Sequence, residues 1–110
     1  MSECIIDHNG TKEWYLNGKL HRVDGPAIEY HNGINEWYVD GFYHREDGPA
    51  VEWVDGYQEW WLNGRLHRDD GPAVEYPDGD KEWWVKGKEY TEDEFVLLQF
   101  TRGKIINERM

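Results

Sequence analysis

The feature that most constrains the fold is an internal repeat of constant period. The dipeptide Glu-Trp recurs at positions 13, 36, 59 and 82, a spacing of 23 residues with no insertion. His-Arg follows in phase at 21, 44 and 67, and Asp-Gly-Pro-Ala at 24, 47 and 70. A fixed period of this kind is typical of arrays in which each unit packs on its neighbours. The chain is therefore expected to form a tandem array.

The ends of the array differ from its middle. Residues 4–10 align with residues 27–33, so the sequence starts within a repeat, and Tyr90 and Thr91 replace the last His-Arg dipeptide. Altered terminal units are expected of an array that caps its ends. We predict a single domain over residues 1–110, made of a half-repeat (4–12), repeats 13–35, 36–58 and 59–81, a partial repeat (82–90) and a C-terminal helix (about 92–102).

Each unit has the pattern of antiparallel β-strands. Apolar runs flank Asn17-Gly18 and its counterparts, which predicts two-residue hairpin turns, and a second Gly turn follows at Asn32-Gly33. Identical stacked units must run in the same direction, so each unit needs an even number of chain reversals. The two Gly turns already supply two. The segment Asp-Gly-Pro-Ala is therefore expected to be a bend or bulge within one strand.

The first turn predicts which side chains share a face. Trp14, Leu16 and His21 fall on one side, and Glu13, Tyr15, Leu20 and Arg22 on the other, because strand side chains alternate. If the second turn also has two residues, Ile28 faces Trp37. The Trp side, expected to be buried, then also carries Ile28, Val51, Val74, Tyr30, Trp53 and Tyr76.

Beyond Tyr90 the pattern becomes helical. Thr91 and Glu94 form a capping-box signature, and apolar residues follow until Gly103, a plausible stop. One helix over about 92–102 should pack on the sheet. The tail from Lys104 to Met110 has no clear preference.

The net charge limits the classes of partner that the protein is expected to bind. Against 12 Lys and Arg the chain has 23 Asp and Glu, a formal net charge of −11, while aromatic residues make up 15%. A surface this acidic disfavours direct binding to nucleic acid or anionic membranes and favours basic partners. Cys4 is the only cysteine, and we see neither a secretory signal nor an apolar run of membrane-spanning length. The expected location is a cytoplasm, including that of an infected host.

The 23-residue period, the aromatic-x-x-Asn-Gly turn and the second Gly turn resemble the MORN repeat. Units such as residues 59–68 are most similar to its bacterial and phage variant. The resemblance covers about residues 4–90 and departs from the usual pattern at Asp-Gly-Pro-Ala. It implies hairpins that stack into a curved, single-layer antiparallel sheet, and a protein that acts as a scaffold or interaction surface. The predicted fold class is thus mainly β with one C-terminal helix.

Two columns of side chains are candidates for binding a protein partner. An aromatic row is expected at roughly 10 Å intervals, either as a docking stripe or as a second small core. A Glu column is either an acidic strip for a basic partner or a solvated row with cross-strand pairs such as Glu13–Arg22, Glu36–Arg45 and Glu59–Arg68. The candidate binding residues are Tyr15, Tyr38, Trp61, Trp84, Glu13, Glu36, Glu59 and Glu82.

The repeated His-Arg-x-Asp motif has a structural and a functional interpretation. Structurally, His21 would stack on Trp14 and Asp24 would bond backbone amides at the bend. Functionally, the motif would hold phosphate-sized anions. The candidate anion-binding residues are Arg22, Arg45, Arg68, His21, His44 and His67. Equivalent histidines roughly 10 Å apart cannot share one metal, so we expect no metal, no cofactor and no catalytic residue.

The leading hypothesis is therefore a non-enzymatic, acidic protein-interaction module. It would engage a basic protein, for example as a phage-encoded inhibitor that occupies the nucleic-acid-binding surface of a host protein. The alternatives are nucleotide or small-anion capture, and a structural scaffold that self-assembles, with a homodimer formed through the strand edge at Ile5-Ile6.

Overall fold

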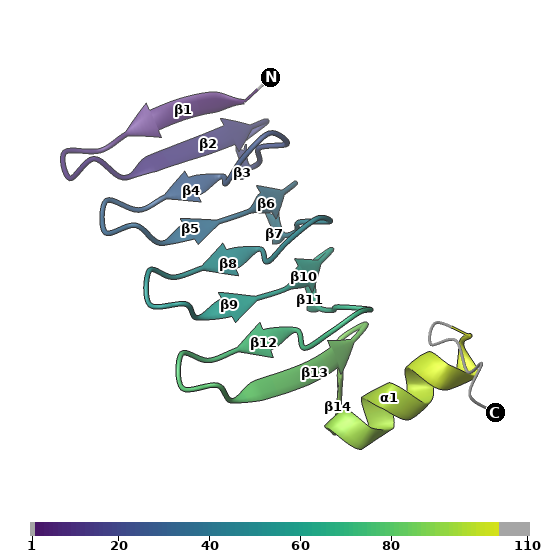
Figure 1. The fold of residues 1–110 in the computed structure, drawn as a ribbon. Helices are drawn as coiled ribbons and strands as arrows, with labels where there is room; N and C mark the ends of the chain where they lie inside the picture. Colours follow the sequence, from purple (N-terminus) through teal and green to yellow (C-terminus); the bar gives the residue numbers. More distant parts are fainter. Residues whose placement is uncertain (1, 104–110) are drawn as a thin grey trace.

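The units are stacked along one direction into an elongated single sheet, shown in Figure 1 of this computed structural model, which describes residues 2–103. The principal extents are 58 × 31 × 22 Å and the radius of gyration is 16.3 Å. A compact domain of this length would have a radius of gyration of about 13 Å. The array therefore exposes both sides of its sheet instead of closing around one core.

Ten strands form the main sheet, in the order β1-β2-β4-β5-β8-β9-β12-β13-β14, with β3 paired to β2. Two further pairs, β6-β7 and β10-β11, form small separate hairpins, and all pairs are antiparallel. The mainly β, antiparallel fold with one C-terminal helix is as predicted. The strands are β1 Glu3–Ile6, β2 Lys12–Leu16, β3 Lys19–Leu20, β4 Ile28–Glu29, β5 Asn35–Glu36, β6 Tyr38–Val39, β7 Phe42–Tyr43, β8 Val51–Glu52, β9 Gln58–Glu59, β10 Trp61–Leu62, β11 Arg65–Leu66, β12 Val74–Glu75, β13 Lys81–Val85 and β14 Lys88–Tyr90.

The first turn of each unit has the predicted two residues. Tyr15 pairs with Leu20, and Leu16 pairs with Lys19. Asn17 and Gly18 both have positive φ, 52° and 77°, as a type I′ turn requires. The corresponding turns of the later units repeat this conformation at positions 40–41, 63–64 and 86–87.

The second turn has three residues, so the condition under which Ile28 was expected to face Trp37 is not met. The Tyr30 amide donates to the Ile34 carbonyl at 2.9 Å, and the Gly33 amide donates to the Tyr30 carbonyl at 2.9 Å. Consequently Ile28 pairs with Glu36, not with Trp37. A register shift of one residue moves a whole strand segment to the other face.

That shift relocates two sets of residues that we expected on the Trp side. They lie on the Glu side, because a directly paired residue projects from the same face as its partner. The expectation that the Trp side is the buried one holds only in part, since Trp14, Trp37 and Trp60 are half-buried and the two sides share the buried residues. The relocated residues are Ile28, Val51, Val74, Tyr30, Trp53 and Tyr76.

The Asp-Gly-Pro-Ala segment is a bend and not a third hairpin, as predicted. Both β3 and β4 run antiparallel to β2, β3 beside its second half and β4 beside its first half. In Figure 1 this segment connects the row of short hairpins to the strands of the main sheet, and the two rows lie next to each other. Each unit thus contributes to two rows, the main ladder and a row of short hairpins.

Neighbouring units meet at a seam with the same three hydrogen bonds each time. At the first seam the Gly41 amide donates to the Leu20 carbonyl at 2.8 Å, and the Arg22 amide donates to the Tyr38 carbonyl at 3.1 Å. The third bond runs from the Asp40 amide to Nδ1 of His21 at 3.0 Å. The bonds recur at the next two seams with Asn63 and Lys86 as the third donors.

The core is a thin line of small side chains at the centre of the ladder. In each full repeat one Ala and the following branched residue are buried, and the alanines are wholly inaccessible. Within the repeats the aromatic side chains are half-buried or exposed, so contacts among aromatic and charged groups on both faces add to this thin core. The buried pairs are Ala27-Ile28, Ala50-Val51 and Ala73-Val74.

The C-terminal helix α1, Glu92–Thr101, begins with the predicted capping box. Thr91 accepts from the Glu94 amide, and the Glu94 side chain accepts from the Thr91 amide. The helix contacts β13 and β14, where Phe95 and Gln99 are buried, and it lies beyond the last hairpin in Figure 1. It therefore covers the end of the array, and the ambiguous tail over 104–110 lies outside the described residues.

Candidate functional site

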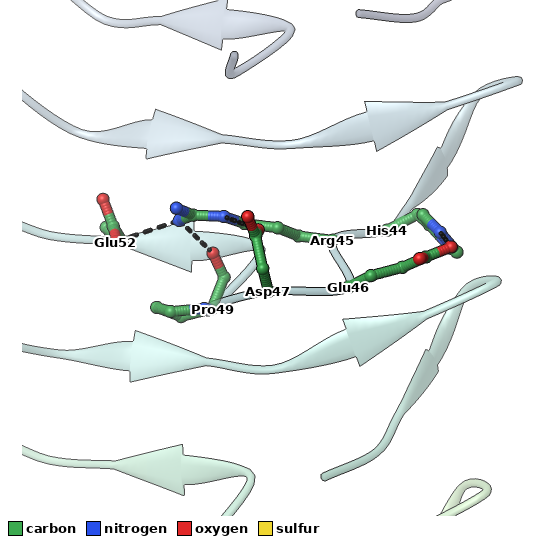
Figure 2. Close-up of polar contacts among 6 residues, drawn as sticks. All are labelled: His44, Arg45, Glu46, Asp47, Pro49 and Glu52. Atoms are coloured by element: carbon green, nitrogen blue, oxygen red, sulfur yellow. Dashed lines mark hydrogen bonds and ion pairs between the residues drawn. The ribbon is translucent and has the colours of Figure 1, made fainter. Parts of the chain in front are cut away.

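Each full repeat holds its arginine in the same network, drawn for the second repeat in Figure 2. Arg45 Nε donates to Asp47 at 3.2 Å, and its Nη1 donates to the Pro49 carbonyl at 3.0 Å and to Glu52 at 3.1 Å. The guanidinium lies over the Trp37 ring, 3.8 Å from its centroid. Arg22 and Arg68 make the corresponding contacts in the other two repeats.

These contacts correct three predictions about the motif. The arginines lie on the Trp side, so the predicted pairs Glu13–Arg22, Glu36–Arg45 and Glu59–Arg68 are wrong. The ladder places Glu13 opposite Ile28 instead, because the chain bends after His21. The sequence predicts His21 as the group over Trp14, whereas Arg22 occupies that place at 3.8 Å. Likewise Asp24 accepts from Arg22 Nε, where we expected backbone amides.

The glycine of Asp-Gly-Pro-Ala has a direct role in this network. A Cβ at Gly48 would lie 2.7 Å from Cζ of Arg45, closer than carbon atoms approach without a shift. The guanidinium is therefore held between the Trp37 ring and the Gly48 backbone. A Cβ at Gly25 or at Gly71 would lie 2.9 Å from Cζ of the corresponding arginine.

The histidines join the units instead of forming a site. His44 Nδ1 accepts from the Asn63 amide of the next unit at 3.0 Å, and its Nε2 lies 3.4 Å from Glu46. Because Nδ1 accepts from a backbone amide, the neutral ring must have its hydrogen on Nε2. In residues 2–103 no group of three His, Cys, Asp or Glu side chains is arranged to hold a metal ion.

The opposite side of the sheet brings together the predicted aromatic row and Glu column. We name it the glutamate–aromatic face. Each glutamate accepts a hydrogen bond from the aromatic residue two positions later in the chain, through a phenol or an indole group. The bonded pairs are Glu13–Tyr15 at 2.8 Å, Glu36–Tyr38 at 3.0 Å, Glu59–Trp61 at 2.8 Å and Glu82–Trp84 at 2.9 Å.

The face also contains tyrosines that sequence analysis assigned to the wrong side. Tyr30 donates to Glu36 at 3.4 Å, and Tyr76 donates to Glu82 at 2.9 Å. Tyr57, which sequence analysis assigned to neither side, donates to Glu59. The carboxylates of this face are thus bonded to neutral phenol and indole donors, in contrast to those bonded to arginine on the other side.

Burial and the neighbouring carboxylates keep these phenols neutral. Burial raises the pKa of Tyr30 to about 12, and the charge of Glu36 adds to the rise. Burial likewise raises the pKa of Tyr38 and of Tyr57 well above its usual value, with further contributions from nearby hydrogen bonds and carboxylates. A phenol that stays protonated remains a donor to its glutamate, so the face keeps its charge pattern through neutral pH.

A cavity of about 440 Å³ opens on this face between the second and third repeats. Aromatic rings make much of its wall: the Trp53 and Tyr57 ring centroids are 5.2 Å apart, and those of Tyr57 and Tyr76 are 5.3 Å apart. Glu36 and Glu59 are also in the wall. The full lining is Glu36, Tyr43, Val51, Trp53, Asp55, Tyr57, Glu59, Tyr76 and Pro77.

The cavity arises where the second repeat departs from its neighbours. Tyr43 stands where the flanking repeats have Leu20 and Leu66, and Tyr57 stands where they have Ile34 and Asp80. Sequence analysis missed Tyr43 and Tyr57 because it followed what the repeats share. A comparison of the repeats position by position for added aromatic residues would have found both.

The comparisons with known proteins add no relationship: no protein-family model matches the chain, and no curated protein or solved structure does. In the part of the chain that the structure describes, no helix has the length and apolar character needed to cross a membrane. The candidate site is therefore defined by geometry alone, as the glutamate–aromatic face with its central cavity.

Proposed function

We propose that the protein is a non-enzymatic interaction module that binds a basic protein partner through the glutamate–aromatic face. The observation that carries the proposal is the column of half-buried glutamates whose hydrogen-bond donors, within residues 2–103, are neutral phenol and indole groups. Each carboxylate has acceptor capacity left, because two oxygens offer about four lone-pair sites. A partner rich in Lys and Arg would supply the missing cations.

The charge of the whole chain supports the same partner. A formal net charge of −11 on 110 residues repels phosphate backbones and anionic lipid and attracts basic proteins over a distance of about one Debye length, roughly 8 Å at physiological salt. The proposed role extends to a phage-encoded inhibitor acting in a host cytoplasm, where the face would occupy a basic, nucleic-acid-binding surface. The similarity to MORN units, which act as interaction surfaces, is a second argument for binding over catalysis.

The test is affinity purification from bacterial lysate with the intact chain as bait. A basic protein should be recovered at low salt and released as salt rises, because screening weakens contacts between exposed charges. The double variant Glu36→Gln and Glu59→Gln keeps an acceptor for each tyrosine but removes two charges, and it should recover much less of that protein.

The matched control is the double variant Glu46→Gln and Asp93→Asn, which removes two charges outside this face. It should recover the partner nearly as well as the original chain. Equal loss in both variants would mean that net charge alone attracts the protein, and salt-insensitive recovery would refute the proposal.

Nucleotide or anion capture by the His-Arg motif has less support. An incoming phosphate would compete with the two carboxylates and the carbonyl that already accept from each guanidinium, as at Arg45. A thermal shift with a nucleotide panel distinguishes this alternative from the first. Self-assembly as a scaffold, including a homodimer through β1, stays a prediction for light scattering to test.

A further inference from the structure

We propose that the cavity between the second and third repeats binds one arginine side chain, and that it is the specific contact within a face that otherwise attracts basic partners by charge. The inference rests on the proposed function and names the group recognised there. Its basis is the combination of aromatic rings and carboxylates that line a single cavity of about 440 Å³, a size within the usual range for ligand sites of roughly 300–1,000 Å³.

The hydrogen-bonding groups of the wall select a ligand that only donates. The Tyr57 hydroxyl donates to Glu59, and Tyr76 donates to Glu82, so both phenols use their one hydrogen inside the protein. The lining contains three carboxylates and no Lys, Arg or His. An anion would be repelled by the three carboxylates, whereas a guanidinium is a cation with five donors and no acceptor.

The carboxylates retain room for such donors. Tyr30 and Tyr38 both donate to the same oxygen of Glu36, Oε1, at 3.4 Å and 3.0 Å. At Glu59 each oxygen receives one donor, Tyr57 on one and Trp61 on the other. Since an ionised carboxylate can accept about four hydrogen bonds, both side chains can bind an incoming cation without breaking the bonds that position them.

The arrangement of the rings favours arginine over lysine. Trp53 and Tyr57 meet at 61°, and Tyr57 and Tyr76 meet at 58°, so the rings present faces and edges at an angle around the cavity. A planar guanidinium can stack on one ring while its N–H groups point in its own plane toward a carboxylate. A lysine ammonium is compact and strongly hydrated, and it gains less from such a wall.

The position of the cavity explains why one arginine would be recognised and not one per repeat. The flanking repeats have no aromatic residue at the positions of Tyr43 and Tyr57. The column of glutamates continues through all units, so charge attraction is distributed along the face. The aromatic enclosure is local, so it fixes the position of the partner along the array.

The test uses capped Gly-Gly-X-Gly-Gly peptides, with X as arginine, lysine or citrulline, titrated into the intact chain. Binding is followed by the NMR signal of the Trp53 indole, assigned with the variant Trp53→Phe. Arginine should give a saturable shift, lysine should bind at least about threefold more weakly, and citrulline, which keeps the shape without the charge, should not saturate.

The variant that removes the enclosure is Tyr43→Leu with Tyr57→Ile. The first repeat already has Leu20 and Ile34 at these positions, so the fold accommodates the change, and a dispersed amide spectrum checks this. Its affinity for the arginine peptide should fall about tenfold. The control Phe42→Leu removes an aromatic ring that is 59% exposed on the Trp side, outside the cavity, and should leave the affinity unchanged.

The outcomes separate this inference from the proposed function. Equal binding of arginine and citrulline, or unchanged affinity in the enclosure variant, would overturn the arginine site. If the enclosure variant still recovers the basic partner from lysate as well as the original chain does, the site is refuted and the interaction through the face stands. If the arginine peptide binds as expected but no basic protein is recovered, the proposed function fails while the site remains.

Discussion

The two sides of this sheet are made from the same repeat, yet they treat charge in opposite ways. On the Trp side each arginine is held by two carboxylates and an indole ring, as Arg45 is by Asp47, Glu52 and Trp37. On the glutamate–aromatic face the carboxylates are bonded to phenols and indoles, as Glu36 is to Tyr38. The first arrangement offsets part of its carboxylate charge with an arginine, and the second bonds its carboxylates to neutral groups.

This difference between the partners of the carboxylates on the two sides shows that an acidic composition alone does not locate a binding surface. Glu29 and Glu36 are both half-buried in paired strands, but Glu29 is matched by Arg22 at 3.1 Å. Removing charge from the Trp side should therefore affect folding, and removing it from the other face should affect binding. Four predictions examine this contrast.

The largest effect on stability is expected from alkali, acting on the glutamate–aromatic face. The folded-state pKa of Tyr30 is raised to about 12 from 10.0, and those of Tyr38 and Tyr57 are also raised. The stability that these phenols contribute is fully present below pH 10 and is lost as the pH rises through their folded-state values, because the unfolded chain releases its protons first.

Urea unfolding measured from pH 8 to pH 12 should show this loss begin near pH 10. The variant Tyr38→Phe removes one ionising group and should make the decline shallower. A free energy of unfolding that is constant up to pH 11 would show that the phenols are not held neutral by the fold.

On the Trp side, Arg45→Ala should lower the free energy of unfolding by about 2–3 kcal/mol. The variant removes the cation over Trp37 and leaves Asp47 and Glu52 without their partner. Arg45→Lys keeps the charge but not the planar donor group, and it should cost less. Urea unfolding measures both values, and recovery of the basic partner should not change, since Arg45 lies on the other side. Lost binding in a folded Arg45→Ala chain would contradict the division between the faces.

A smaller effect is expected where the units meet. His44→Ala removes the acceptor of the Asn63 amide at the seam and should cost about 1 kcal/mol. His44→Asn offers a carbonyl oxygen near the position of Nδ1 and should recover part of this stability. Hydrogen exchange at the Asn63 amide gives a direct measurement, because its protection should fall in the alanine variant and return partly in the asparagine variant.

The smallest effect is a gain. Lys86 has a φ of 52° in the turn where two other units have asparagine, a residue that adopts this conformation more easily. Lys86→Asn should raise the free energy of unfolding by about 0.5 kcal/mol, while the backbone donor to His67 is kept. Asn63→Lys, the reverse change in the preceding unit, should lower it by a similar amount in the same urea experiment.

The parts of the fold that depend on local chemistry were predictable from the sequence. The turn at Asn17-Gly18 follows from two residues that accept positive φ, and the helix start follows from Thr91 and Glu94. The second turn was not resolved, because an Asn-Gly or Asp-Gly pair fits both a two-residue and a three-residue loop. Pro77 was the overlooked signal: it stands at the second position of a turn closed by the Gly79 amide bonding the Tyr76 carbonyl, where proline is favoured.

The candidate site was predictable only in part. Alternation along β2 correctly placed Glu13 beside Tyr15 and apart from Trp14. The cavity could not be predicted, since the wrong register put Trp53 and Tyr76 on the other side, away from Glu59. The arginine network was also hidden, because a long side chain that leaves a bend can reach Glu29, seven residues away from Arg22 in the chain.

The repeated seams have a consequence for how such a chain can change length. Since the same three bonds join each full repeat to the unit that follows it, a block of 23 residues could be deleted or duplicated and the new junction would close like the old ones. Growth by whole blocks would lengthen the charged column without disturbing what is already folded. A few substitutions within one block, such as those at Tyr43 and Tyr57, would then suffice to create a cavity at any chosen repeat of an otherwise uniform array.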